Sequence, residues 1–339
     1  MTARRGNLTL LVLAMAGLLA AIPVALRAAT RSADAIFSDS LPSRTLTFSD
    51  AKLRVIYDPA AFTLPEREID DWVLRSARAT AAFFGRFPTR EVTIAIVPGK
   101  GRDVQEGEAT FDPMPRIRIV LGRDTSAGLL KRNSTMVHEM AHLGFPDLDE
   151  AHLWLHEGLA TYVEAVARAQ AREIAPAQMW GWLATIAKQG LPGDDEKRGL
   201  ERTKDEDRRY YGGALYWLTA DVEIRKRTNN RFGVRDAIRA ILASGGTLAV
   251  DWTPQKALRI GDEAVGVPAL TELFATWRNT PVAPDLDALW QSLGVEANGL
   301  KTTLVNTAPL SDIRRAITAQ PTTPVLLRQP AMLYEATSR

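Results

Sequence analysis

The sequence predicts an α+β fold, in which a small N-terminal mixed or antiparallel sheet packs on a mainly helical subdomain. Between residues 43 and 122, short stretches of alternating or buried apolar residues are typical of strands. From about residue 129 to 280, apolar residues recur at helical spacing instead. The chain has no internal repeat, so one such arrangement accounts for its central part.

The first half of the chain is predicted to hold four strands and one helix. The strands fall at 45–48, 53–57, 92–97 and 116–121, and the helix at 65–84. Ser49-Asp50 supplies a turn between the first two strands, and Pro98-Gly99 ends the third. The glycine-rich, charged stretch that follows is expected to be a loop. The alternation at 116–121 predicts a half-exposed strand that could serve as an edge for an extended substrate.

The second half is predicted to be helical, with one long charged loop. Helices are expected at 129–143, 151–172, 175–188, 210–227, 234–243 and 267–277. The segment 190–209 carries many charges and is interpreted as a solvated loop, or alternatively as a mobile flap beside a site. Residues 281–339 are expected to form a short helical extension and a weakly ordered tail.

Composition excludes several classes of function. Of 339 residues, 46% are hydrophobic and 24% charged, which is typical of a globular protein. The net charge is +2 and no long Lys/Arg block occurs, so we expect no nucleic-acid partner. The absence of cysteine excludes thiolate metal ligands and a cysteine nucleophile.

The N-terminus has the pattern of an export segment. Arg4 and Arg5 precede an uncharged apolar run from Leu8 to Leu26, and Ala33-Asp34-Ala35 fits a small-x-small cleavage site. Residues 1–35 are therefore predicted to be a signal peptide or an N-terminal membrane anchor, and the length of the run leaves both open. Export to the periplasm or the extracellular space follows, with 8–26 as a possible membrane tether.

All four histidines lie within 19 residues, and two of them form an H-E-x-x-H pattern. His138 and His142 are four residues apart, so on a helix both imidazoles face one ion. Glu139 lies about 100° around the helix, where it can reach water beside that ion. The pattern is typical of zinc peptidases, in which the glutamate is the general base. The alternative is a surface helix with two ordinary histidines.

A catalytic zinc site requires a third protein ligand, and Glu157 is the best candidate. It begins a second amphipathic helix, and a Gly/Pro/Asp-rich turn at 144–149 allows that helix to return beside the first. Two histidines and one glutamate form an established zinc ligand set.

The two motifs together resemble the gluzincin metallopeptidases. His138-Glu139-Met140-Ala141-His142 is followed by Trp154-Leu155-His156-Glu157-Gly158-Leu159-Ala160-Thr161-Tyr162, which is similar to the second motif of the aminopeptidase N and glycyl aminopeptidase families. The resemblance implies a zincin-type catalytic domain over 36–280, with His138, His142 and Glu157 as zinc ligands and Glu139 as base. It also implies a peptide or protein substrate.

A third motif of these families places an oxyanion-stabilising tyrosine at the start of a later helix. Aligning Tyr210-Tyr211-Gly212-Gly213-Ala214-Leu215 with it assigns that role to Tyr210, with Tyr211 as the alternative. The separation of 14 residues between His142 and Glu157 is shorter than is usual in these families. Two further features depart from the pattern: Gly212 replaces a lysine, and the G-x-M-E-N motif is absent, its nearest counterpart being 107–111. The last two departures favour the alternative function, a catalytically inactive zincin-fold binding or assembly factor at the membrane surface.

Other conspicuous residues are expected to have supporting roles. Glu164, two turns beyond Glu157, could hydrogen-bond a zinc-bound histidine or be an exposed carboxylate. His156 is expected to point away from the site and His152 to flank the second helix. Five aromatic residues are expected in the core: Trp154, Tyr162, Trp180, Trp182 and Trp217.

Overall fold

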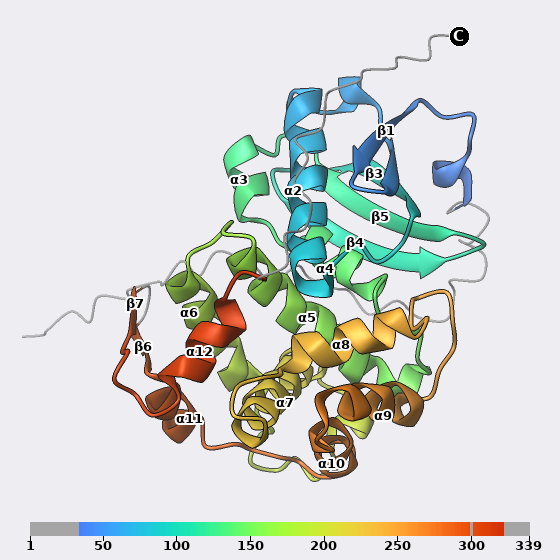
Figure 1. The fold of residues 1–339 in the computed structure, drawn as a ribbon. Helices are drawn as coiled ribbons and strands as arrows, with labels where there is room; N and C mark the ends of the chain where they lie inside the picture. The colour runs from blue at the N-terminus through green and yellow to red at the C-terminus, as the bar shows by residue number, and fades with distance from the viewer. Residues whose placement is uncertain (1–33, 299–300, 322–339) are drawn as a thin grey trace, which may run out of the picture.

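The computed structural model describes residues 34–298 and 301–321, which form a five-stranded sheet above a group of helices (Figure 1). This confirms the predicted α+β fold. Among these residues, no helix combines the length and apolar composition needed to cross a membrane. The predicted export segment lies outside the described residues, except for its last two.

The sheet is mixed, with the order β1-β2-β3-β5-β4. Its strands are β1 (Ser43–Phe48), β2 (Ala51–Ile56), β3 (Glu91–Gly99), β4 (Val104–Phe111) and β5 (Pro115–Gly122). The pairs β1/β2 and β4/β5 are antiparallel, whereas β2/β3 and β3/β5 are parallel. Parallel neighbours need a crossover, and helix α2 (Glu66–Phe84) makes the one between β2 and β3.

Three predictions about the strands were wrong. The expected loop after β3 contains strand β4, despite its glycine and charged residues, because it pairs along β5 and its Glu108 accepts a 3.3 Å hydrogen bond from Arg118 Nε. The stretch 116–121, expected to be a possible edge, is interior: β5 has β3 on one side and β4 on the other. The edge strand on this side of the sheet is therefore β4, and β1 is the edge on the other side. Strand β3 also continues through Pro98-Gly99 rather than ending there.

The helical half follows the predicted pattern with two differences. The stretch 129–143 is broken at Asn133-Ser134, and helix α9 was not predicted. The helices are α3 (Ala127–Arg132), α4 (Thr135–His142), α5 (Leu153–Gln170), α6 (Pro176–Gln189), α7 (Gly213–Arg227), α8 (Val234–Ala243), α9 (Pro254–Val265) and α10 (Ala269–Trp277). The charged stretch 190–209 is mostly irregular, as expected, with one 3₁₀ turn at Leu200–Arg202.

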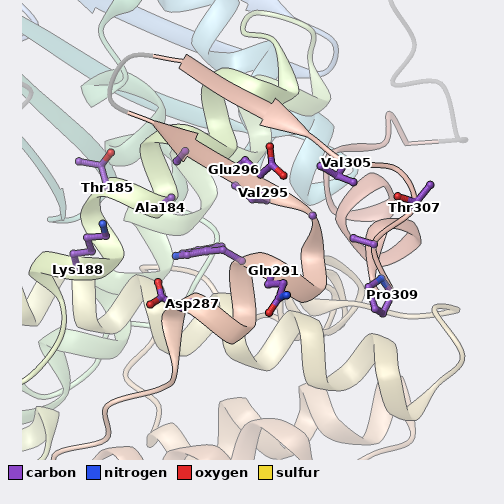
Figure 2. A pocket seen from close by; sticks show the side chains of 14 residues that line it. Ala184, Thr185, Lys188, Asp287, Gln291, Val295, Glu296, Val305, Thr307 and Pro309 are labelled. Carbon is purple, nitrogen blue, oxygen red and sulfur yellow. The ribbon is translucent and has the colours of Figure 1, made fainter.

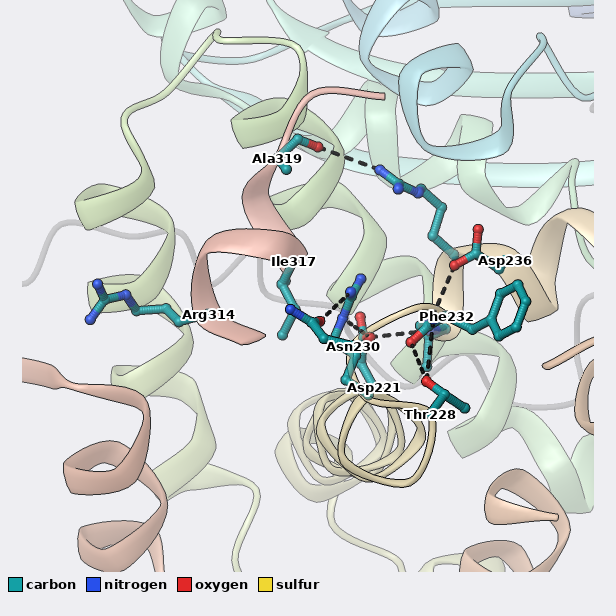
Figure 3. A network of polar contacts seen from close by, with 12 residues as sticks. Asp221, Thr228, Asn230, Phe232, Asp236, Arg314, Ile317 and Ala319 are labelled. Atoms are coloured by element: carbon teal, nitrogen blue, oxygen red, sulfur yellow. Dashed lines mark hydrogen bonds and ion pairs between the residues drawn. The ribbon is translucent and has the colours of Figure 1, made fainter. Parts of the chain in front are cut away.

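The C-terminal part packs onto the same helices. It consists of α11 (Leu286–Leu293), the hairpin β6 (Val295–Asn298) and β7 (Lys301–Leu304), and α12 (Ser311–Thr318). Gln170 at the end of α5 donates a 2.8 Å hydrogen bond to the carbonyl oxygen of Ile317, and Arg235 on α8 donates one of 3.4 Å to that of Ala319. Figure 3 shows α12 lying beside the polar network that surrounds Asp221.

Helix α4 lies where two hydrophobic cores meet. Met136 and Met140 belong to the core under the sheet, whereas Val137 and Ala141 belong to the larger core among the helices. Because two adjacent sides of this short helix, about 100° apart, are buried in different cores, the orientation of its remaining side is fixed. That side carries the two histidines of the H-E-x-x-H pattern.

Candidate metal centre

The histidine helix begins and ends where its sequence dictates. Asn133 Oδ1 accepts a 2.9 Å hydrogen bond from the backbone N–H of Thr135, which satisfies one free donor at the start of α4. The helix ends at His142, and Gly144 follows. The intervening turn leads into α5, which packs beside α4 and carries Glu157 in its second turn.

Two histidines and one glutamate converge between these helices. Glu157 Oε2 lies 3.1 Å from His138 Nε2 and 3.5 Å from His142 Nε2. One donor atom from each of the three side chains lies within 4.8 Å of the other two. This convergence was predicted from the two motifs, and it requires the return of α5 toward α4 that the Gly/Pro-rich turn permits.

Glu164 lies behind the first histidine. Its Oε2 accepts a 3.2 Å hydrogen bond from His138 Nδ1, on the ring side opposite Glu157. The side chain of Glu164 is only 10% exposed, which rules out the alternative of an exposed helix carboxylate. A carboxylate in this position fixes the orientation of an imidazole and leaves its Nε2 available to a metal.

The protonation of the cluster is consistent with a cation site. Burial alone would lower the pKa of His138, but hydrogen bonds to Glu157 and Glu164 raise that pKa well above its usual value. Burial would raise the pKa of Glu157, whereas His142 and His138 hold it well below its usual range. In the metal-free cluster, Glu157 is therefore an ionised carboxylate and His138 carries a proton. A divalent cation could take the place of that proton. Two imidazole nitrogens and one carboxylate oxygen fit zinc.

Glu139 points from α4 toward edge strand β4. It is 5% exposed, and its burial raises the pKa of the carboxyl group to about 7. It lies against Gly107, where a Cβ would come within 2.4 Å of Glu139 Oε1. A glycine at this point of β4 therefore leaves the space that the carboxylate occupies. This contact was not predicted, because the glycine and charged residues around Gly107 are typical of a loop.

Tyr210 stands beside the histidines on a π-helical turn, η6 (Arg208–Gly212). Its ring is stacked at 6.1 Å, centroid to centroid, from that of His138. Burial, followed by the charges of Glu157 and Glu139, raises the pKa of Tyr210, so its hydroxyl stays protonated. Tyr211 packs instead against the helical core. Of the two candidate tyrosines, Tyr210 is thus the one at the cluster, and π-turns are frequent at functional sites.

Two further histidines flank the centre. His156 was expected to point away, but its ring is stacked on that of His142 at 4.5 Å, because the crossing of α4 and α5 buries both. Burial lowers the pKa of His156 to about 3, so it packs there as a neutral ring. His152 flanks α5 as expected, with Nδ1 3.3 Å from Glu201 Oε2. Of the five predicted core aromatics, only Trp182 is half-buried rather than buried.

Comparison with known proteins gives matches among solved structures. No protein-family model and no curated protein matches the sequence. An aminopeptidase N family protein from Idiomarina loihiensis is 14% identical, with a TM-score of 0.55, and the match covers 76% of this chain and 49% of that one. An M1 zinc metallopeptidase from Deinococcus radiodurans is 20% identical, with a TM-score of 0.48, covering 72% and 53%.

These comparisons define the fold class of the chain. The likeness to the Idiomarina protein shows that the chain shares the fold of an aminopeptidase N family protein, which supports the predicted gluzincin resemblance at that level. The chain spans about half the length of the structures that it matches. The cluster of His138, His142 and Glu157 could bind a metal ion.

Proposed function

We propose that the protein is a zinc-dependent metallopeptidase that hydrolyses peptide bonds. The observation that carries this proposal is the convergence of His138, His142 and Glu157 beside a buried Glu139 and a protonated Tyr210. Zinc in this ligand set acts as a Lewis acid that polarises a carbonyl group and makes nearby water more acidic. The ligand roles of the three residues are part of the proposal.

Glu139 is suited to be the general base. In the metal-free site its pKa is about 7, close to neutral pH, where a carboxyl group can both accept and return a proton. In the proposed reaction it takes a proton from the attacking water and passes it to the leaving nitrogen. Tyr210 keeps its hydroxyl proton and donates a hydrogen bond to the carbonyl oxygen as negative charge develops there.

The substrate is proposed to lie along edge strand β4. No described strand pairs with the outer side of β4, and the strand passes directly over Glu139 at Gly107. An extended peptide that adds to a free strand edge forms backbone hydrogen bonds that hold it in register. This replaces the expectation that β5 offers the edge.

The site of action is proposed to be outside the cytoplasm. Support comes from the sequence alone, through Arg4, Arg5 and the apolar run 8–26. A fusion of residues 1–35 to a reporter that is active only after export should be secreted or tethered, and retention in the cytoplasm would contradict the proposal.

Hydrolysis by the wild type and a Glu139→Gln variant tests the proposed reaction. We expect the wild type to cleave members of a mixed peptide library, and Glu139→Gln to keep its metal while losing turnover by at least about a hundredfold. Full activity in the variant would refute the role of Glu139. Absence of cleavage by a metal-loaded wild type would favour the inactive binding or assembly factor.

A further inference from the structure

A groove of about 700 Å³ lies away from the candidate metal centre, between α6, α11, β6 and the segment that follows β7 (Figure 2). We call it the β6 groove. None of the residues of the metal centre lines it. Its volume is within the range of sites that bind ligands of several hundred daltons.

One wall of the β6 groove is the edge of a strand. Val295, Glu296 and Ala297 line it consecutively, although side chains of neighbouring strand residues point to opposite faces. Because three consecutive residues border the groove, it must run along the edge of the strand and not along one of its faces. In the described chain β6 pairs only with β7, so its other edge has no strand partner.

The register of the hairpin identifies the free backbone groups. The N–H of Val305 donates a 2.8 Å hydrogen bond to the carbonyl oxygen of Gly294. In an antiparallel pair, every second residue faces the partner strand, so Glu296 also faces β7. Val295 and Ala297 consequently direct their N–H and C=O groups outward along the groove.

A buried side-chain donor lines the same groove. Trp290 is 7% exposed, and its Nε1 has no hydrogen-bond partner. Buried indole N–H groups usually have one. Trp72, Trp154 and Trp180 also lack one, but they do not line the groove. Of these four indoles, only that of Trp290 borders the groove.

Charged groups at one end of the groove are free to contact a ligand. Lys188 and Asp287 lie at the same end in Figure 2, and neither takes part in an ion pair within the described residues. Thr185 lines the groove on the same helix as Lys188. The groove therefore has polar and charged side chains at this end, in addition to the strand edge of β6.

We propose that the β6 groove binds an extended peptide segment, which pairs with the outer edge of β6 and accepts a hydrogen bond from Trp290 Nε1. A peptide backbone supplies both requirements at once, because its N–H and C=O groups match a strand edge and a further carbonyl oxygen can accept from the indole. This binding is separate from hydrolysis and does not require the proposed peptidase activity.

Fluorescence anisotropy with a labelled, end-capped Thr-Val-Thr-Val-Thr peptide tests this proposal. The protein carries Glu139→Gln, so that the probe is not cleaved. In that background, Trp290→Phe keeps the ring but removes the donor, and we expect binding to weaken roughly three- to tenfold. Ala297→Pro removes an outward N–H without removing a β6–β7 hydrogen bond, and we expect a loss of about tenfold.

Matched controls separate these effects from general damage. Trp72→Phe removes an equally unpartnered indole far from the groove, and Ala297→Val keeps the N–H in a strand-compatible residue. Both are expected to bind the probe like the parent protein. The same peptide methylated on its central backbone nitrogens should not bind.

Three outcomes would overturn the proposal. The first is that Trp290→Phe and Ala297→Pro bind the probe as tightly as the parent protein. The second is undiminished binding of the methylated peptide. The third is a protein dimer that forms through β6 and is abolished by Ala297→Pro. Failure of hydrolysis in the wild type would leave this binding result unaffected, so the two proposals can fail independently.

Discussion

Gly158 and Gly213 meet backbone to backbone: a Cβ on Gly158 would lie 2.3 Å from the carbonyl carbon of Gly213. The first residue follows Glu157 on α5, and the second begins α7 directly after the π-turn with Tyr210. Two glycines thus allow these elements to approach closely enough for Glu157 and Tyr210 to share one site. This explains why both motifs contain glycine at these positions.

Substitution of Gly213 by alanine should therefore destabilise the protein. A Cβ there would lie 2.1 Å from the carbonyl oxygen of Trp154, which is backbone and cannot rotate away. We expect Gly213→Ala to lower the free energy of unfolding by about 1–3 kcal/mol, as measured by urea denaturation. Gly193→Ala, with nothing within 4 Å of its Cβ, is the control. Equal midpoints for the two variants would contradict the close approach.

Removal of Glu164 should weaken metal binding although it is not a proposed ligand. The hydrogen bond from His138 Nδ1 orients the ring, so Glu164→Ala is expected to weaken zinc affinity by about 10- to 100-fold. Competition with a chromophoric chelator measures this change. Glu150→Ala, an exposed glutamate in the turn before α5, should leave affinity unchanged. Unaltered affinity in Glu164→Ala would rule out the orienting role.

The two adjacent tyrosines should respond differently to loss of their hydroxyl groups. Tyr210 is stacked near His138, whereas Tyr211 packs against the helical core. We expect Tyr210→Phe to lower kcat by about 10²- to 10³-fold with unchanged zinc content, as for loss of one oxyanion donor. Tyr211→Phe should keep most activity. The reverse order of effects would transfer the proposed role to Tyr211.

In the metal-free protein, Glu139 should make stability depend on pH. Its pKa is about 7 when folded, against 4.5 as a free side chain. Below pH 4.5, Glu139 is protonated in both the folded and the unfolded protein. As the pH rises toward 7, Glu139 ionises first in the unfolded protein, so the free energy of unfolding decreases. We expect wild type to lose about 3 kcal/mol relative to Glu139→Gln between pH 4 and 8. Urea unfolding in the presence of a chelator measures this difference, and a constant difference across that range would refute the pKa shift.

Sequence patterns predicted the elements whose signals are local. The helix at 234–243 has the bounds expected from apolar spacing alone, because one side of it is buried in the helical core. The cluster of His138, His142 and Glu157 was also predictable, since its spacing and intervening turn are contained in 20 residues. Helix α9 carries signals that could have revealed it, with Thr253 capping its start and Gly266 ending it.

Other features depend on contacts distant in sequence. Strand β4 contains Gly107 and two glutamates, and only its pairing with β5 and the space required by Glu139 explain its conformation. The stacking of His156 on His142 likewise depends on how α4 crosses α5, which neither helix encodes alone. The domain limits 36–280 and 281–339 and the export segment stay predictions.

Metal content tests the central claim most directly. Mass spectrometry of the protein purified without chelators should find one zinc ion per chain in the wild type, and zinc lost or much reduced in Glu157→Ala, because that variant lacks one of three ligands. Zinc absent from the wild type, or retained fully in Glu157→Ala, would contradict a metal centre formed by His138, His142 and Glu157.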